Sequence, residues 1–216
     1  MKTTGSLLLL ALALAGCGKG GDSGGDDGDT GATGLLFVED FSGPFPIPDW
    51  VITNPGALGS ATIDSSSGSP LPSLLIAQPG APTGNLSVTT KATFASPSLT
   101  VSAQMALGGA AGLGTAAIII SDPLTPATTA SVVYDAATST ITFNITGTAS
   151  APVADPGGFP AFTFSVDGAG TATWTVNNGA VPVMTKAGFP GGNLTVALNN
   201  SSNRNFRFDN VRVSAP

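Results

Sequence analysis

The chain has 216 residues, a sequence pI of about 4.2 and only 9% charged residues. It contains no histidine and a single cysteine, Cys17, which excludes a Ser-His-Asp triad, a working Cys-His pair and a histidine-based zinc site. Its 7 lysines and arginines face 13 aspartates and glutamates and form no cluster, which argues against a nucleic-acid partner.

The first residues carry the three parts of a secretory signal. Lys2 supplies positive charge, residues 7–14 form a short apolar core, and Gly16 is the small residue before Cys17. The apolar core is too short to span a bilayer, which needs about 20 apolar residues. Residues 14–17 read Leu-Ala-Gly-Cys and match the lipobox of bacterial lipoproteins at all four positions. Residues 1–16 are therefore predicted to be a signal peptide that is removed.

The resemblance to lipoproteins implies a lipid anchor on Cys17. The expected groups are a diacylglyceryl on its sulfur and an acyl chain such as palmitate on the new amino terminus. One acyl chain binds a membrane marginally, whereas two or more hold it firmly. Gly18 follows Cys17 in place of Asp, which by analogy with the sorting rule of enteric bacteria favours the outer membrane of the cell envelope. The alternative is an ordinary signal peptide that happens to contain a cysteine.

Residues 17–34 are predicted to be a disordered tether that carries the lipidated cysteine. Glycine, aspartate, serine and threonine make up nearly all of the segment, and such a composition cannot bury enough apolar surface to become ordered. A glycine-rich coil of this length spans roughly 20–25 Å on average. That distance is enough to hold a domain at 35–216 clear of the lipid headgroups.

From Leu35 to the end, apolar and polar residues alternate with a period of two. The alternation is clearest in 99–107, 141–145, 162–166, 172–176 and 194–198, and it indicates half-buried antiparallel strands. Turn sequences at 135–139, 167–170 and 177–179 punctuate the runs. The run 118–120 is isoleucine throughout, which predicts a central strand covered on both faces. Residues 35–216 are therefore expected to form an all-β, two-sheet antiparallel sandwich or barrel in a single domain.

Three stretches carry a second resemblance. The domain opens with Phe-Val-Glu-Asp-Phe-Ser-Gly at 37–43, residues 68–74 lead a strand, and the chain closes with Phe-Arg-Phe-Asp-Asn-Val-Arg-Val at 206–213. These stretches resemble the concanavalin A-like jelly roll in its laminin-G-like bacterial form. The predicted strands 171–176 and 180–184, joined by Asn-Asn-Gly, are similar to a late hairpin of that family. A galactose-binding-like jelly roll is the alternative fold.

The closing strand changes parity in its middle. Phe206 and Phe208 share one face of the strand, but Val211 and Val213 have the opposite parity. One extra residue has to be absorbed near Asp209, as in a β-bulge. Such a bulge would turn the Asp209 carboxylate or nearby carbonyl groups toward an ion.

The family resemblance implies a structural calcium ion between the first and last strands. Calcium prefers several carboxylate and carbonyl oxygens, and Glu39 or Asp40 together with Asp209 would supply the charge. The alternative is that these acids accept hydrogen bonds from neighbouring turns or pair with Arg207 or Arg212.

The candidate sugar contacts are the aromatic residues other than phenylalanine: Trp50, Trp174 and Tyr134. Sugar-binding sandwiches stack pyranose rings on exposed aromatic faces, because such rings suit amphipathic partners. The alternative is a core role, since Trp174 shares its strand face with Val176 and Trp50 lies near the start of the domain.

We expect no enzyme activity. Glycosidases of this fold class use two glutamates in a Glu-x-Asp-x-x-Glu strand, and Glu39 is the only glutamate of this chain. Glu39 and Asp40 are neighbours on a predicted strand and point to opposite faces, so they cannot flank one glycosidic bond.

Three functions remain open from the sequence. The first is a surface lipoprotein whose sandwich binds carbohydrate, in adhesion or polysaccharide capture. The second is a structural or protein-binding envelope lipoprotein without a sugar site. The third, which we favour least, is a degenerate glycoside-active enzyme.

Overall fold

The computed structural model describes most of the chain from Gly34 onward. The described residues are 34–54, 59–78, 84–95, 97–106, 112–125, 127–179 and 183–216. The predicted signal peptide, the lipidation site Cys17 and the tether up to residue 33 lie outside these ranges and stay predictions. Within the described ranges, no helix is long and apolar enough to cross a membrane.

The first of two antiparallel sheets contains both the first and the last strand of the described chain. Its order is β15-β14-β13-β7-β17-β4-β3, and β1 also pairs with β17. The strands are β1 (Leu35–Glu39), β3 (Ser60–Asp64), β4 (Ser73–Ala77), β7 (Leu99–Met105), β13 (Ala161–Val166), β14 (Ala172–Val176), β15 (Met184–Lys186) and β17 (Phe206–Ser214).

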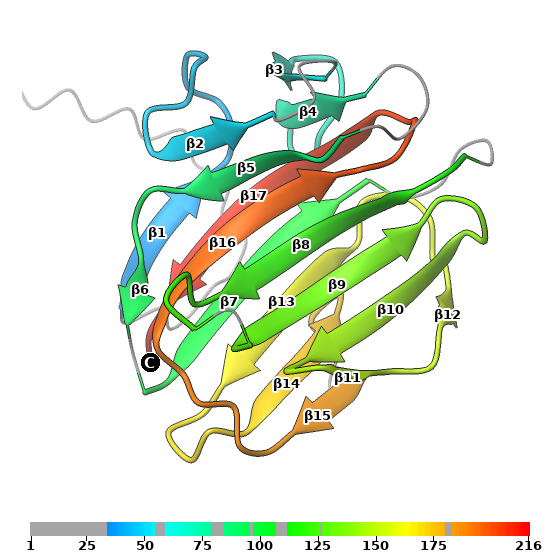
Figure 1. Ribbon diagram of the computed structural model, residues 1–216. Coiled ribbons are helices and arrows are strands. Elements are labelled where there is room, and N and C mark those ends of the chain that lie inside the picture. Colours follow the sequence, from blue (N-terminus) through cyan, green and yellow to red (C-terminus); the bar gives the residue numbers. More distant parts are fainter. Residues whose placement is uncertain are drawn as a thin grey trace, which may run out of the picture. The chain divides into compact units, whose positions relative to one another are not determined.

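The second sheet has the order β11-β10-β9-β8-β16-β5-β2, with β12 paired to β10 and β6 to β16. Figure 1 shows its strands β16, β8, β9 and β10 in front of the first sheet. The strands are β2 (Trp50–Thr53), β5 (Leu86–Thr90), β6 (Phe94–Ala95), β8 (Thr115–Ser121), β9 (Thr129–Asp135), β10 (Thr140–Ile145), β11 (Thr148–Ala149), β12 (Val153–Ala154) and β16 (Asn193–Asn200).

The core lies between the two sheets and follows the predicted alternation. Along β7, β10 and β13 every second residue is buried and the residues between are half-buried. Phe143 of β10 packs against Phe162 and Trp174 of the first sheet, with ring centroids 6.2 and 6.1 Å apart. The all-β, two-sheet antiparallel sandwich is therefore confirmed. The turns predicted at 135–139, 167–170 and 177–179 all lie at strand ends.

One expectation about a single strand is corrected, and another falls partly outside the described residues. Ile118 and Ile120 are buried between the sheets, but Ile119 points outward and is half-buried, because no third layer is described over this face of β8. In the late hairpin, Trp174 of β14 pairs with Met184 of β15. The described part of the second strand is Met184–Lys186, and residues 180–182 of the predicted strand lie outside the described ranges.

The β-bulge predicted in the last strand is confirmed. The pairing of β17 with β7 shifts register between Asp209 and Arg212. Asn210 has a φ of 48°, in the left-handed region that asparagine tolerates better than most residues. The bulge buries Phe208 and Val211 on the same side despite their odd spacing.

A buried amide connects the two sheets at one end of the sandwich. The Asn200 Nδ2 atom, in β16, donates to the carbonyl oxygens of Ile76 in β4 (2.8 Å) and Arg204 (2.7 Å). Its Oδ1 atom accepts hydrogen bonds from the backbone N–H and the hydroxyl of Ser202. Gln78 donates to the Asn200 carbonyl oxygen over 2.6 Å. This fully buried side chain therefore has all of its hydrogen-bonding groups satisfied.

We predict that Asn200→Ala lowers the free energy of unfolding by about 2–4 kcal/mol, because it leaves buried carbonyl and amide groups without partners. Urea unfolding of the variant and the parent measures the difference. Asn205→Ala changes an exposed residue of the same hairpin and should cost less than about 0.5 kcal/mol. Equal losses in the two variants would contradict the assigned role of Asn200.

Candidate functional site

The carboxylate of Glu39 is engaged where β1 ends. Its Oε1 atom accepts a hydrogen bond from the Phe41 N–H (2.8 Å), and its Oε2 atom accepts one from Trp50 Nε1 (3.2 Å). Trp50 belongs to β2 of the second sheet, so this bond joins the edges of the two sheets. Glu39 is thus directed at the indole and the adjacent turn.

Asp40 and Asp209 are brought within electrostatic reach of each other, as the calcium hypothesis requires of this pair. Asp209 is fully buried, and its oxygens accept hydrogen bonds from the N–H groups of Ser69 and Asn210, both at 2.7 Å. Burial raises the pKa of Asp209, and the charge of Asp40 raises it further. Hydrogen bonds from Ser42 hold the pKa of Asp40 below its usual value.

These two acids do not form a larger acidic cluster. Within the described part of the chain, no group of three or more His, Cys, Asp or Glu side chains could hold a metal ion. Any further oxygen ligands from the described residues would have to be hydroxyls, side-chain amide oxygens or backbone carbonyls. The Ser69 carbonyl lies beside the pair, since it accepts a hydrogen bond from Asn210 Nδ2.

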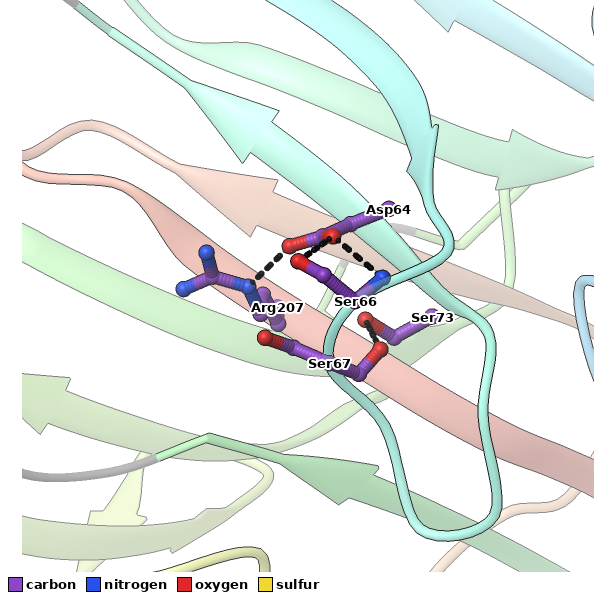
Figure 2. A network of polar contacts seen from close by, with 5 residues as sticks. All are labelled: Asp64, Ser66, Ser67, Ser73 and Arg207. Carbon is purple, nitrogen blue, oxygen red and sulfur yellow. Dashed lines mark hydrogen bonds and ion pairs between the residues drawn. The ribbon is translucent and has the colours of Figure 1, made fainter.

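A further acid, Asp64, fixes the β3–β4 loop to the last strand, as Figure 2 shows. Asp64 Oδ2 accepts from Arg207 Nε at 2.6 Å, and Asp64 Oδ1 accepts from the Ser66 hydroxyl (2.6 Å) and N–H (2.9 Å). The Ser73 hydroxyl donates to the Ser67 carbonyl at 2.7 Å. The bonds from Ser66, and then Arg207, lower the pKa of Asp64 to about 2. Arg207 therefore pairs with Asp64 rather than with any of the three predicted calcium ligands.

The three candidate aromatic residues are core residues in this structure. Trp50 is 4% exposed, and Trp174 and Tyr134 are fully buried. Trp174 Nε1 donates to the Asn144 carbonyl in the opposite sheet at 3.2 Å, and Tyr134 packs edge-on against Phe206. None of the three offers a ring face to solvent, so the expected sugar platform at these positions is corrected.

Two hollows lie instead at one end of the sandwich. Figure 1 shows this end, where the β13–β14 turn and the segment entering β16 come near the C-terminus. The first hollow, which we call the groove, has a volume of about 500 Å³ on the outer face of the first sheet. It is lined by Ser98, Leu99, Thr100, Ser165, Val166, Asp167, Thr171, Thr173, Ser214, Ala215 and Pro216.

The groove is built by strand register. Ser165 of β13 lies between Thr173 of β14 and Thr100 of β7, and Ser214 of β17 pairs with Thr100 from the other side. Because residues directly opposite one another share a face, these four hydroxyl-bearing side chains form one row across the sheet.

Asp167 closes the groove at the turn. Its Oδ1 atom accepts hydrogen bonds from the N–H groups of Thr171 (2.8 Å) and Ala169 (2.9 Å). The hydrogen bond from the Thr171 N–H, followed by that from Ala169, holds the pKa of Asp167 below its usual value. The carboxylate is therefore an ionised acceptor at neutral pH.

The second hollow, the end pocket, has a volume of about 610 Å³ and no charged residue in its lining. Glycine, proline and the buried Phe189 make up most of the wall. It is lined by Ala95, Pro97, Val166, Gly168, Ala169, Gly170, Phe189, Pro190, Gly191, Gly192 and Asn193.

Sequence reasoning missed both hollows. The alternation placed Thr100, Ser165 and Thr173 on the wet face of their strands, but it gave no sign that three separate strands would align them. The signal that could have found the end pocket is the glycine-rich composition of 168–170 and 191–192.

Comparison with known proteins identifies the fold. No model of a known protein family matches the sequence, and no curated protein sequence matches it. Among solved structures, the chain is similar to the cellulose-induced protein Cip1, with a TM-score of 0.61 and 17% identity over 83% of this chain and 97% of that one. It is also similar to the carbohydrate recognition domain of Emp47p, with a TM-score of 0.58 and 12% identity over 85% and 98% of the two chains.

A third similar structure is the β-glucanase of Bacillus licheniformis, with a TM-score of 0.55 and 12% identity over 85% of this chain and 99% of that one. The described domain is a jelly-roll sandwich. Its two antiparallel sheets and its likeness to these structures confirm the predicted class, an all-β, two-sheet jelly-roll sandwich. At such low identity the likeness shows the fold alone.

We predict that Asp64→Asn is less stable than the parent at neutral pH, because the Arg207 ion pair is lost. Asp64 has a folded pKa of about 2 against an ordinary value of 3.8. Its contribution is therefore fully present above pH 3.8 and is lost as the pH falls toward 2. Urea unfolding between pH 7 and pH 2 should show the two proteins converging at low pH. A gap that stays constant with pH, or an equal effect of Asp49→Asn at an exposed site, would contradict this assignment.

Proposed function

We propose that this domain binds carbohydrate through the groove at the end of the first sheet. The observation that carries the proposal is the row of Ser and Thr hydroxyls that ends at the Asp167 carboxylate. Hydroxyls both donate and accept, and a carboxylate accepts, so the row complements the hydroxyls of a sugar. A volume of about 500 Å³ is in the range of small-molecule sites. The similar structures include a carbohydrate recognition domain, which is consistent with this function.

We further propose that the domain binds sugar without cleaving it. Hydrolysis by the usual mechanism needs two carboxyl groups that flank the bond, about 5–9.5 Å apart. Among the residues that line the groove and the end pocket, Asp167 is the only acid. The glycosidase neighbours share the fold, but a groove with one carboxylate and a row of hydroxyls is suited to binding.

The proposed setting is the bacterial cell envelope. Lipidation of Cys17 would hold the protein at the membrane, with the outer membrane favoured, and the tether would present the sandwich to a surface polysaccharide. This setting depends on the lipobox resemblance alone.

A protein-binding role is the second candidate. The observation that favours it is the exposed apolar strand β1, where Leu35, Leu36 and Val38 are each about half exposed. An exposed apolar edge strand is a template for pairing with another chain.

The proposed carbohydrate function is tested on the purified full chain with a broad glycan panel. We expect binding, and we expect the double variant Thr100→Val, Thr173→Val to weaken it about tenfold, because isosteric removal of two hydroxyls costs about 0.5–1.5 kcal/mol each. The matched control Thr89→Val, Thr142→Val changes outward threonines of the second sheet and should leave affinity unchanged. No binding by the folded protein, or equal losses in both double variants, would overturn the groove as the site.

We also propose a structural calcium ion held by Asp40 and Asp209. The donor chemistry fits, because a buried carboxylate whose pKa is raised by burial and by a second acid is stabilised by a cation. Glu39 is left out of the proposed ligand set because the second acid that raises the pKa of Asp209 is Asp40, while Glu39 is directed at the Trp50 indole and the Phe41 N–H.

Calcium should therefore raise the melting temperature of the parent over that in EDTA, by roughly 5 °C or more when the ion is far above its dissociation constant. Asp209→Asn should abolish the rise. Glu39→Gln should lower the baseline stability, since it removes one of two acceptors, and keep the rise. A calcium response that is lost in Glu39→Gln but kept in Asp209→Asn would show that Glu39, and not Asp209, is the ligand. Absence of any calcium response in the parent would contradict the proposed ion.

A further inference from the structure

The groove and the end pocket lie on opposite sides of one shared wall. Val166 lines both hollows. The turn after it divides them, because Asp167 and Thr171 line the groove whereas residues 168–170 line the end pocket. A ligand that leaves the groove over this turn therefore enters the end pocket.

The dividing turn is held by its own hydrogen bonds. The Asp167 N–H donates to the Thr171 carbonyl at 3.1 Å, and the Gly170 N–H donates to the Asp167 carbonyl at 2.9 Å. The Phe189 N–H donates to the Gly170 carbonyl at 2.9 Å, which joins the turn to the opposite wall of the end pocket. The Asp167 carboxylate adds the two bonds described above. A preformed wall costs little ordering entropy when a ligand lies across it.

The two hollows differ in chemistry. The groove presents hydroxyls and a carboxylate, whereas the end pocket presents backbone groups, proline rings, apolar side chains and one amide, Asn193. Phe189 is buried beneath it and packs against Phe164, with ring centroids 5.3 Å apart. Gly191 has a φ of 66°, and a Cβ atom there would meet nothing within 4 Å. The backbone conformation at this position favours glycine, and glycine leaves the pocket wall without a side chain.

We infer that the ligand is a linear oligosaccharide segment that crosses the 167–170 turn, with one part in the groove and the next in the end pocket. This inference rests on the proposed carbohydrate function. Each hollow alone has the volume of a small-molecule site. When two sites are occupied by one connected ligand, the second contact is intramolecular and raises affinity well beyond either site alone. Chain length, rather than the identity of a single sugar, is then the main determinant of affinity.

The test is titration of the full chain with cello-oligosaccharides and chito-oligosaccharides of one to six units. These two series share a linkage and differ in an acetamido group, so they also report whether the end pocket prefers that substituent. We expect affinity to rise at least tenfold between the single sugar and the tetrasaccharide in at least one series.

Two variants separate the hollows. Ala95→Leu and Ala169→Leu each place bulk in the lining of the end pocket, and either should remove the gain from longer chains while the affinity for the shortest bound sugar changes less than twofold. Ala149→Leu, at an exposed alanine of β11, is the matched control and should keep the full gain.

The outcomes distinguish this inference from the function on which it rests. Binding that is independent of chain length, or a length gain that survives both pocket variants, overturns the crossing and leaves the groove as a sugar site. Loss of length dependence only in the pocket variants supports the crossing. Absence of binding of both series to the folded protein at millimolar concentration overturns the crossing by such chains, whereas the proposed function is overturned only when the broad glycan panel also shows no binding.

Discussion

The structure depends on hydrogen bonds that pass from one sheet to the other. The single cysteine lies outside the domain, so no disulfide can join the sheets, and apolar packing alone does not fix how they are aligned. The Asn200 amide joins β16 to β4 at one end, and the Trp174 indole joins β14 to β10. At the opposite edge Glu39 joins β1 to the Trp50 indole. Each bond is directional, and breaking one leaves a buried polar group unsatisfied.

These hydrogen bonds between the sheets limit which residues are available to bind a ligand. The sandwich uses both tryptophans and its only glutamate to align its sheets, and these are the residues from which a sugar platform or a paired-acid site is usually built. The groove is lined instead mainly by small hydroxyl-bearing side chains. The proposed recognition of sugar would therefore rely on hydrogen bonds with hydroxyls and backbone groups, and on the Asp167 carboxylate as an acceptor, at the end where β7, β13, β14 and β17 meet.

The sequence predicts what depends on local spacing. Alternation gave the strands and the core faces, glycine and asparagine gave the turns, and the parity change between Phe208 and Val211 gave the bulge. It could not predict that Ile119 would face outward, because a continuous apolar run has no face of its own. It could not predict the groove, since Thr100, Ser165 and Ser214 come together only through strand order. For Asp209, the sequence predicted the bulge. It could not predict that the N–H of Ser69, 140 residues away, donates a hydrogen bond to the Asp209 carboxylate.

The fold is about equally similar to a β-glucanase and to a carbohydrate recognition domain. Fold similarity therefore does not distinguish cleavage from binding, and only individual side chains can do so. On the outer face of the second sheet, β9 presents Thr129, Ser131, Val133 and, at its end, Asp135. Asp135 Oδ1 accepts from the N–H groups of Ala137 and Thr138 in its own hairpin. The groove on the first sheet has Asp167, which is likewise bound to its own turn. Hydrolysis by the usual mechanism needs two carboxyl groups that flank the bond. The groove lining contains one acid, Asp167, and this is the observation that supports the proposal of binding without cleavage.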